Sequence, residues 1–260
     1  MADLNRLNAF SAAITVMLIT LLVSQFARAQ GVVLPLPSED QRIITTQLGP
    51  IVVRALPSKP IEDVSLYFPL EERESTYHVT AGRHVGSTQT LGLAKVMRPN
   101  GKSAWRFEFS PLLAGFISQA PGGDLVMPSL SDAKHGVVVV TLPANPFVLK
   151  GIKPGETRSY MQRVLVYALE DPADQEYSGS LHGTYTYLGT YQVAVPAGTF
   201  DTALLRLTCH GKVGLVHTHD TAYYFLAPGK GVVAMISQED ATAFWIIHID
   251  STSGRVLAAN

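Results

Sequence analysis

The stretch from Thr184 to Gly211, TYTYLGTYQVAVPAGTFDTALLRLTCHG, alternates apolar and polar residues with a period of two and breaks that rhythm once. After the break, Leu205 and Leu207 fall on one face of an extended chain and Arg206 falls on the other. The break is Pro196-Ala197-Gly198, where proline presets φ for a type I turn and glycine accepts the positive φ that closes it. The pattern therefore predicts a β-hairpin.

The same rhythm predicts strands along most of the chain. The pair Asn100-Gly101, between the β-like runs 88–97 and 103–109, is typical of a second hairpin. Further strands are predicted at 135–141, 157–169, 184–195, 199–210, 212–226, 231–237 and 242–250. A helical period is confined to one short segment, Pro111 to Gln119.

Consecutive hairpins of this kind form an antiparallel meander. A long meander has to curl or close, because an open sheet leaves exposed edges and one uncovered apolar face. We therefore predict a mainly β fold with little helix, built on a single curved antiparallel sheet that is a half-open or closed β-barrel.

The first 29 residues have the features of a signal peptide. Arg6 precedes the apolar run Ala12–Val23, and small residues stand at positions 27 and 29, where a signal peptidase reads them. The run is short for a membrane-spanning helix, which needs roughly 20 apolar residues. We expect cleavage after Ala29, no stable membrane insertion afterwards, and a periplasmic or secreted protein. An uncleaved N-terminal anchor is the alternative.

An extended arm followed by one domain is expected after the signal peptide. Residues 30–62 are interrupted by prolines and predict an extended N-terminal arm with one edge strand near Gly49–Arg54. Residues 63–260 are predicted to form one antiparallel β domain. Cys209 is the only cysteine, so no disulfide forms within the chain and no cysteine is present for lipid attachment at the cleavage site.

Composition narrows the classes of partner. The net charge is −1 and the sequence has no basic run, which argues against a nucleic-acid partner. Charged residues make up 16% of the chain, against an average of about 25%. A chain with so few charges is expected to have an apolar surface or an apolar cavity.

Two later segments carry a family resemblance. Tyr191–Phe200 (YQVAVPAGTF) and Tyr224–Val233 (YFLAPGKGVV) resemble the turns of a group of exported bacterial proteins of unknown function, and Leu66–Leu70 and Ser75–Val79 resemble their first strands. That group resembles the LolA/LolB lipoprotein carriers. The resemblance implies a half-open barrel over a lipid-sized apolar cavity. Because the chain has no lipidated cysteine, it departs from LolB.

Histidines raise the question of a metal site. His217 and His219 are two residues apart, so they share a strand face, and Cys209 on the preceding strand would have to approach them to complete a zinc site. No further ligand has a recognisable spacing. The alternative is a polar outer strand face with Cys209 as a small buried residue. We expect no metal and no cofactor.

Signatures of nucleophilic catalysis are absent from the sequence. Ser180 lies in GSLHG, where the register of the GxSxG elbow is wrong, so a loop between strands is expected instead. Cys209 and His210 are adjacent on one strand and point to opposite sides. We expect no enzymatic activity.

Aromatic residues at alternating strand positions are the candidate ligand-binding residues. They are Trp105, Phe107, Phe109, Tyr185, Tyr187, Tyr223 and Phe225, with Trp245 on a later strand. A ligand cavity and a filled core both fit this pattern. The expected function is an exported, non-enzymatic binding protein for an apolar small molecule or lipid. The alternative is an envelope assembly module that pairs with a protein through a sheet edge.

Overall fold

The computed structural model describes residues 31–97, 101, 103–171, 173–243 and 247–259. The expected signal peptide, residues 1–29, and Trp245 lie outside the described residues. The fold is 66% strand and 7% helix, and the predicted mainly β class is confirmed.

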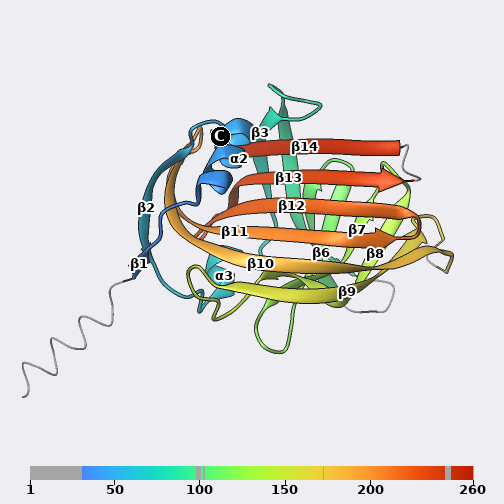
Figure 1. Cartoon of the computed structure of the whole chain (residues 1–260). Helices are drawn as coiled ribbons and strands as arrows, with labels where there is room; N and C mark the ends of the chain where they lie inside the picture. Colours follow the sequence, from blue (N-terminus) through green and yellow to red (C-terminus); the bar gives the residue numbers. More distant parts are fainter. Residues whose placement is uncertain (1–30, 98–100, 102, 172, 244–246, 260) are drawn as a thin grey trace, which may run out of the picture. The chain divides into compact units, whose positions relative to one another are not determined.

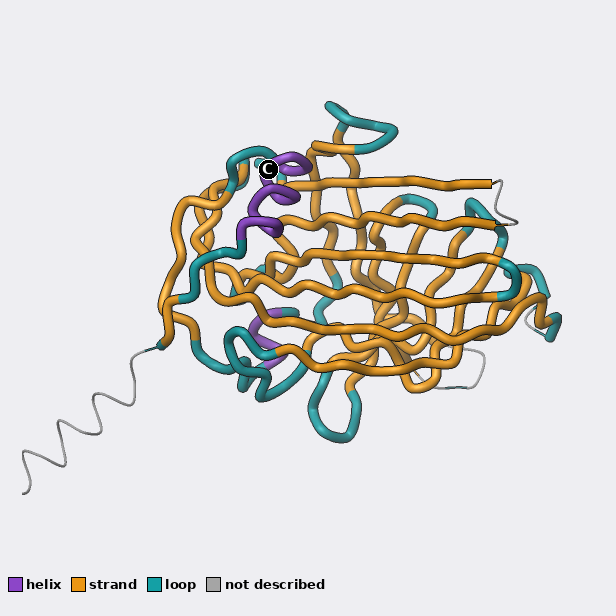
Figure 2. The backbone as a smooth tube through the Cα atoms, in the orientation of Figure 1, coloured by secondary structure: helices purple, strands orange, loops and turns teal. Residues whose placement is uncertain are grey.

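Figure 2 shows that strands dominate the fold. The helices are α2 (Ser38–Leu48) and α3 (Val64–Tyr67). The strands are β1 (Val32–Val33), β2 (Val52–Ser58), β3 (Arg73–Ala81), β4 (Thr88–Met97), β5 (Ser103–Ser110), β6 (Leu113–Gln119), β7 (Leu125–Asp132), β8 (Val137–Val148), β9 (Thr157–Ala168), β10 (Gln175–Val195), β11 (Gly198–Val213), β12 (Val216–Ala227), β13 (Gly231–Ala243) and β14 (Ile247–Leu257).

Twelve antiparallel strands, β3 to β14, form a closed barrel, and two extra strands extend the sheet (Figure 1). Each strand of the ring pairs with its neighbours in the chain, and β14 pairs with β3. Because consecutive strands alternate in direction, the connections β3–β4, β5–β6, β7–β8, β9–β10, β11–β12 and β13–β14 all lie at one end, which we call the open end.

β10 changes partners along its length. Its first part pairs with β9, from Gln175 to Thr186, and its second part pairs with β2, from Thr190 to Val193. The register on β11 shifts between Tyr187 and Gly189, where φ is +138°. This irregularity lies between the part of β10 within the ring and the part that carries β2.

The predicted turn between β10 and β11 lies where expected, but β10 begins at Gln175 rather than at residue 184, and β11 ends at Val213 rather than at residue 210. Val195 stands opposite Gly198, whose φ is +133°, so Pro196-Ala197 form the turn between β10 and β11. β4 begins at Thr88 and ends at Met97, as predicted, and β5 follows at Ser103.

Some local predictions were wrong. Pro111–Gln119 is not helical, because residues 113–119 form β6 and pair with both β5 and β7. The segment 30–62 is not wholly extended, because it contains α2. Leu66–Leu70 is not a strand, because the Asp63 side chain accepts hydrogen bonds from the amides of Ser65 and Leu66 and begins α3 there.

Two hydrophobic cores lie on opposite faces of the sheet. The interior core fills part of the ring and includes the α3 residue Val64, together with Phe68. The outer core covers the outward face of β10–β14 and includes Ile44 and Leu48 of α2. These two residues and Asp40 are four positions apart in turn, so one face of α2 is buried against the sheet.

Candidate functional site

An aromatic cluster fills part of the barrel interior. Phe107 and Phe109 of β5 pack edge to face with ring centroids 4.9 Å apart, and Phe68 packs on Phe107 at 5.3 Å. Phe147 and Tyr224 complete the cluster at 5.6 Å from each other. We call these five residues the aromatic plug. None is more than 9% exposed, so the plug is packed core.

The structure divides the seven predicted ligand-binding residues between two faces of the sheet. Five of them contribute to the interior core or pack against it: Trp105, Phe107, Phe109, Tyr185 and Tyr187. Tyr223 and Phe225 belong to the outer core instead, because Tyr224 between them is the inward-facing residue. The single aromatic face expected from the sequence is therefore two faces, and α2 packs against the outer one.

Toward the open end, one side of the interior is apolar and incompletely covered. Leu113 of β6 and Leu130 of β7 pack against the interior core, yet both remain half-buried. Val139 of β8 stands opposite Leu130, shares its inward face, and is also half-buried. We call these three residues the apolar wall. These three side chains therefore leave apolar surface uncovered near the open end.

The opposite side of the same interior is polar. On β13, Ser237 and Glu239 follow Met235 on the inward face, and both are exposed. Ser253 and Ser251 of β14 stand opposite them, and the Ser251 hydroxyl donates a hydrogen bond to Glu239 Oε2 at 3.2 Å. We call these four residues the polar wall. The open half of the barrel, between the two walls, is therefore amphipathic.

Cys209 and Asp220 face each other on neighbouring strands inside the barrel. The Cys209 thiol donates to Asp220 Oδ2 at 3.6 Å, and the Thr218 hydroxyl donates to Oδ1 at 2.9 Å. Burial raises the pKa of Asp220 to about 6. Burial and the neighbouring Asp220 charge raise the pKa of Cys209 to about 12. A thiol with such a pKa stays protonated and is a poor nucleophile.

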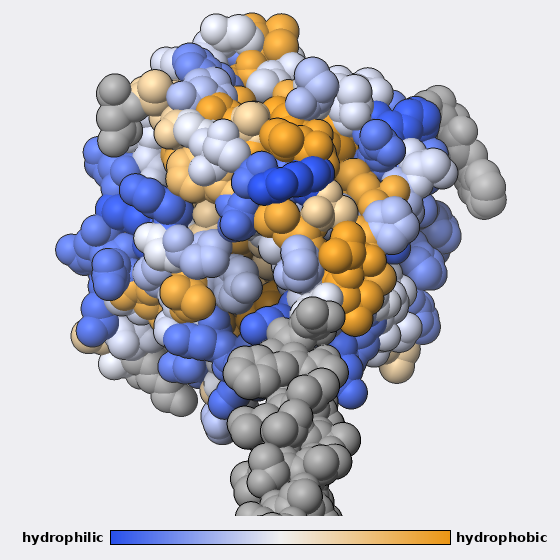
Figure 3. All heavy atoms as spheres, turned by 90° about the vertical axis from the view of Figure 1, so that its left-hand side faces the viewer, coloured by the Kyte–Doolittle hydropathy of each residue, from blue (hydrophilic) through white to orange (hydrophobic). Residues whose placement is uncertain are grey.

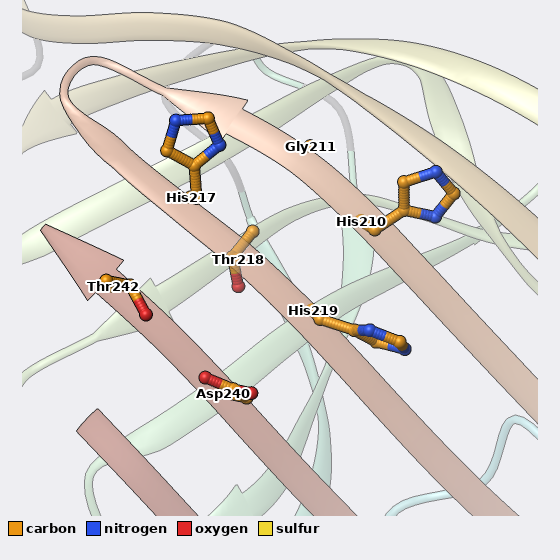
Figure 4. A pocket seen from close by; sticks show the side chains of 7 residues that line it. All are labelled: His210, Gly211, His217, Thr218, His219, Asp240 and Thr242. Atoms are coloured by element: carbon orange, nitrogen blue, oxygen red, sulfur yellow. The ribbon is translucent and has the colours of Figure 1, made fainter. Parts of the chain in front are cut away.

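The histidines lie on the outer face, away from Cys209. Figure 4 shows His210, His217 and His219 around an open hollow of about 320 Å³ that Asp240 also lines. His210 stands opposite His219, whose ring centroid is 6.3 Å away. Because Cys209 points inward, it does not join these histidines. Within the described ranges, no three His, Cys, Asp or Glu side chains are placed to hold a metal ion.

Ser180, expected in a loop, lies within β10 opposite Lys212.

Sequence reasoning also missed two buried charged groups. Asp40 of α2, only 1% exposed, accepts hydrogen bonds from Arg206 Nη1 through both carboxylate oxygens, at 2.8 and 3.0 Å, and from the Tyr223 hydroxyl at 2.7 Å. Arg255 lies inside the barrel and is 8% exposed. No local sequence motif marks Asp40 or Arg255, because the residues that surround each of them come from distant parts of the chain.

Comparisons with known proteins add little to this geometry. No family model matches the chain, and no curated protein matches it. A lipoprotein candidate from Parabacteroides distasonis ATCC 8503 aligns over 76% of this chain and 99% of its own, with 13% identity and a TM-score of 0.31. The hypothetical lipoprotein YmcC from Escherichia coli (K12) aligns over 75% of this chain and 86% of its own, with 9% identity and a TM-score of 0.31. Likeness at this level assigns neither family nor function.

Proposed function

We propose that the protein is an exported, non-enzymatic binding protein that holds a lipid-like ligand in the open half of its barrel. The observation that carries the proposal is the apolar wall, whose three side chains are half-buried inside a closed ring. Covering apolar surface contributes about 25 cal/mol per Å². A hydrocarbon chain laid on this wall would gain that energy without any rearrangement of the aromatic plug.

The ligand we propose is amphipathic rather than wholly apolar. The polar wall faces the apolar wall and offers hydroxyl groups and one carboxylate to a headgroup. Pockets for small molecules commonly combine an apolar lining with a few polar groups that fix orientation. Among the predicted aromatic residues, Trp105 is half-buried on the inward face, but on β5 it lies farther from the open end than Phe107, so we do not place it at the ligand.

Export rests on the sequence of residues 1–29, so we propose a periplasmic or extracellular location after cleavage. None of the helices in the described part of the chain is long and apolar enough to cross a bilayer.

Titration of residues 30–260 with a fluorescent fatty acid tests this function. We expect saturable binding of one molecule per chain. Leu130→Gln should weaken it about tenfold, equivalent to about 1.4 kcal/mol, because a polar amide replaces part of the apolar wall. Val53→Gln is the matched control, since Val53 lies on β2 and is 56% exposed. Absence of saturable binding would contradict the proposal.

A second candidate function has one observation in its favour. β2 lies outside the ring, and Figure 3 shows apolar side chains gathered at the end of the molecule where β2 lies, at the left of Figure 1. Val33 and Val53 are 54% and 56% exposed there. An envelope protein could add a strand at this edge of the sheet, where the two-residue β1 leaves most of β2 unpaired on that side. A stable complex that Val53→Arg abolishes, in a protein that binds no lipid, would favour this alternative.

A further inference from the structure

Arg255 places a positive charge inside the barrel. It stands opposite Met235 of β13 and Val79 of β3, and Met235 belongs to the interior core. Only 8% of the residue is exposed. Burial of an ionised group this complete costs several kcal/mol unless an opposite charge compensates it.

The described partners of Arg255 are neutral. Nε donates to Gln89 Oε1 at 2.9 Å, and Nη1 donates to Ser253 Oγ at 3.1 Å. Among the side chains that the structure describes, no carboxylate forms an ion pair with this guanidinium, and none accepts from its third nitrogen, Nη2. Burial lowers the pKa of Arg255. The charge is held by hydrogen bonds but not neutralised.

The inward-facing residues next to Arg255 on β13 and β14 become more exposed to solvent toward the open half of the barrel. Ser253, its hydrogen-bond partner, stands opposite Ser237, which is exposed on the inward face. Glu239 lies four residues beyond Met235 on β13, roughly 13 Å along the strand. An anion entering from the open end would therefore pass the polar wall and reach Arg255 at its inner limit.

We propose that Arg255, with Gln89 and Ser253, binds the anionic headgroup of a single-chain amphiphile, whose hydrocarbon chain then lies along the apolar wall. The inference rests on the proposed function and names its ligand class. A carboxylate or phosphate oxygen accepts from guanidinium in a charge-assisted hydrogen bond. Such a headgroup supplies the compensating charge that the described residues do not.

Calorimetric titration with dodecanoate, dodecyl phosphate and dodecanol at pH 8 tests the inference on residues 30–260. The wild-type protein should bind at least one of the two anions ten or more times more tightly than the alcohol. Arg255→Gln should remove that preference and leave alcohol binding unchanged, whereas Arg255→Lys should retain part of it. Arg163→Gln is the control, because Arg163 is exposed on β9. Preference for dodecanoate or for dodecyl phosphate would separate a carboxylate from a phosphate ligand.

Thermal unfolding of the same variants separates ligand binding from a structural role. Without ligand, Arg255→Gln should melt no lower than the wild-type protein, because an uncompensated buried charge is removed. Equal binding of anions and alcohol by the wild-type protein, or an anion preference that survives Arg255→Gln, would overturn the inference while leaving the proposed function standing. If none of the three ligands binds, the proposed function itself fails, and the inference fails with it.

Discussion

Asp40 and Asp220 are carboxylates with contrasting surroundings. Asp40 accepts hydrogen bonds from Arg206 and Tyr223, so its buried charge has a cation beside it. Asp220 lies inside the barrel beside Cys209 and Thr218, which are both neutral donors. The Asp40 carboxylate therefore holds α2 onto the sheet through an ion pair, whereas burial raises the pKa of the Asp220 carboxylate to about 6. The partners of Asp40 lie far from it in the sequence, and Asp220 faces an interior that no local sequence pattern defines. The sequence alone therefore did not reveal the role of either residue.

Removal of the Asp40 carboxylate should destabilise the protein strongly. Asp40→Ala leaves Arg206 without its anion, and the loss of one partner from a buried pair costs about 3–5 kcal/mol. The Arg206 side chain is 31% exposed, so we expect a smaller loss, about 2–3 kcal/mol in urea unfolding. Glu39→Ala removes the surface pair with Arg42 and should leave the free energy of unfolding unchanged. Equal effects of the two substitutions would contradict the role of Asp40.

Asp220 should make stability depend on pH. The pKa of Asp220 in the folded protein, about 6, lies above its ordinary value of 3.8. Between about pH 4 and pH 6 the folded protein therefore keeps a proton on Asp220 that the unfolded chain has already lost. The free energy of unfolding should therefore fall as pH rises through that window and then level off. Asp220→Asn should remove this slope and raise stability at pH 7 by about 1–2 kcal/mol.

Urea unfolding between pH 4 and pH 8 measures the effect. Asp250→Asn is the matched control, because Asp250 is exposed on β14. The same decrease in Asp220→Asn as in the wild-type protein would show that another group causes it.

At the scale of single elements, hairpins were predictable and helices were not. The turn residues 196–198 and the alternation around them specify β10 and β11 locally, because proline and glycine restrict the turn and the period restricts the faces. α2 does carry local signals, with acidic residues in its first turn and Gly49, at φ +81°, after its end. Its flanking prolines favoured an extended chain. The apolar residues of β6 fit a helical period, but pairing with β5 and β7 decides their conformation.

The β10–β11 turn can be tested by paired substitutions. Gly198 has φ +133°, and a Cβ there would meet nothing closer than 3.9 Å, so the cost of a side chain is backbone strain alone. Gly198→Val should lower the free energy of unfolding by about 1 kcal/mol or more. Ala197→Ser, one position earlier, should change it little. Equal melting temperatures for the two variants would contradict the assigned turn.

The aromatic plug predicts a large cost for truncating Phe107. This ring contacts Phe68, Phe109 and Phe147 and is 5% exposed, so Phe107→Ala leaves a cavity. We expect a loss of about 3–5 kcal/mol in chemical unfolding. Tyr177→Ala removes an aromatic side chain that is 54% exposed and should cost less than about 0.5 kcal/mol. A small loss at Phe107 would mean that the plug is loosely packed.

At the scale of the whole molecule, ring closure and the amphipathic interior determine what the protein can do. The sequence predicts a curved meander, but it does not distinguish a half-open sheet from a closed ring, because closure depends on β14 pairing with β3, which is far away in the sequence. It likewise does not predict which half of the interior is filled. The plug draws residues from β5, β8, β12 and the segment after α3. The apolar wall can be told apart from the packed core only when the positions of those plug residues in the fold are known.

Native mass spectrometry of the protein purified after export tests most directly whether the open half holds a ligand. We predict a second species heavier than the bare chain by one amphipathic molecule, and its loss in Leu130→Gln but not in Val53→Gln. Fragmentation of the released molecule would identify its headgroup. Bare protein alone, together with no saturable binding of added dodecanoate, would contradict the account and leave a barrel without a ligand.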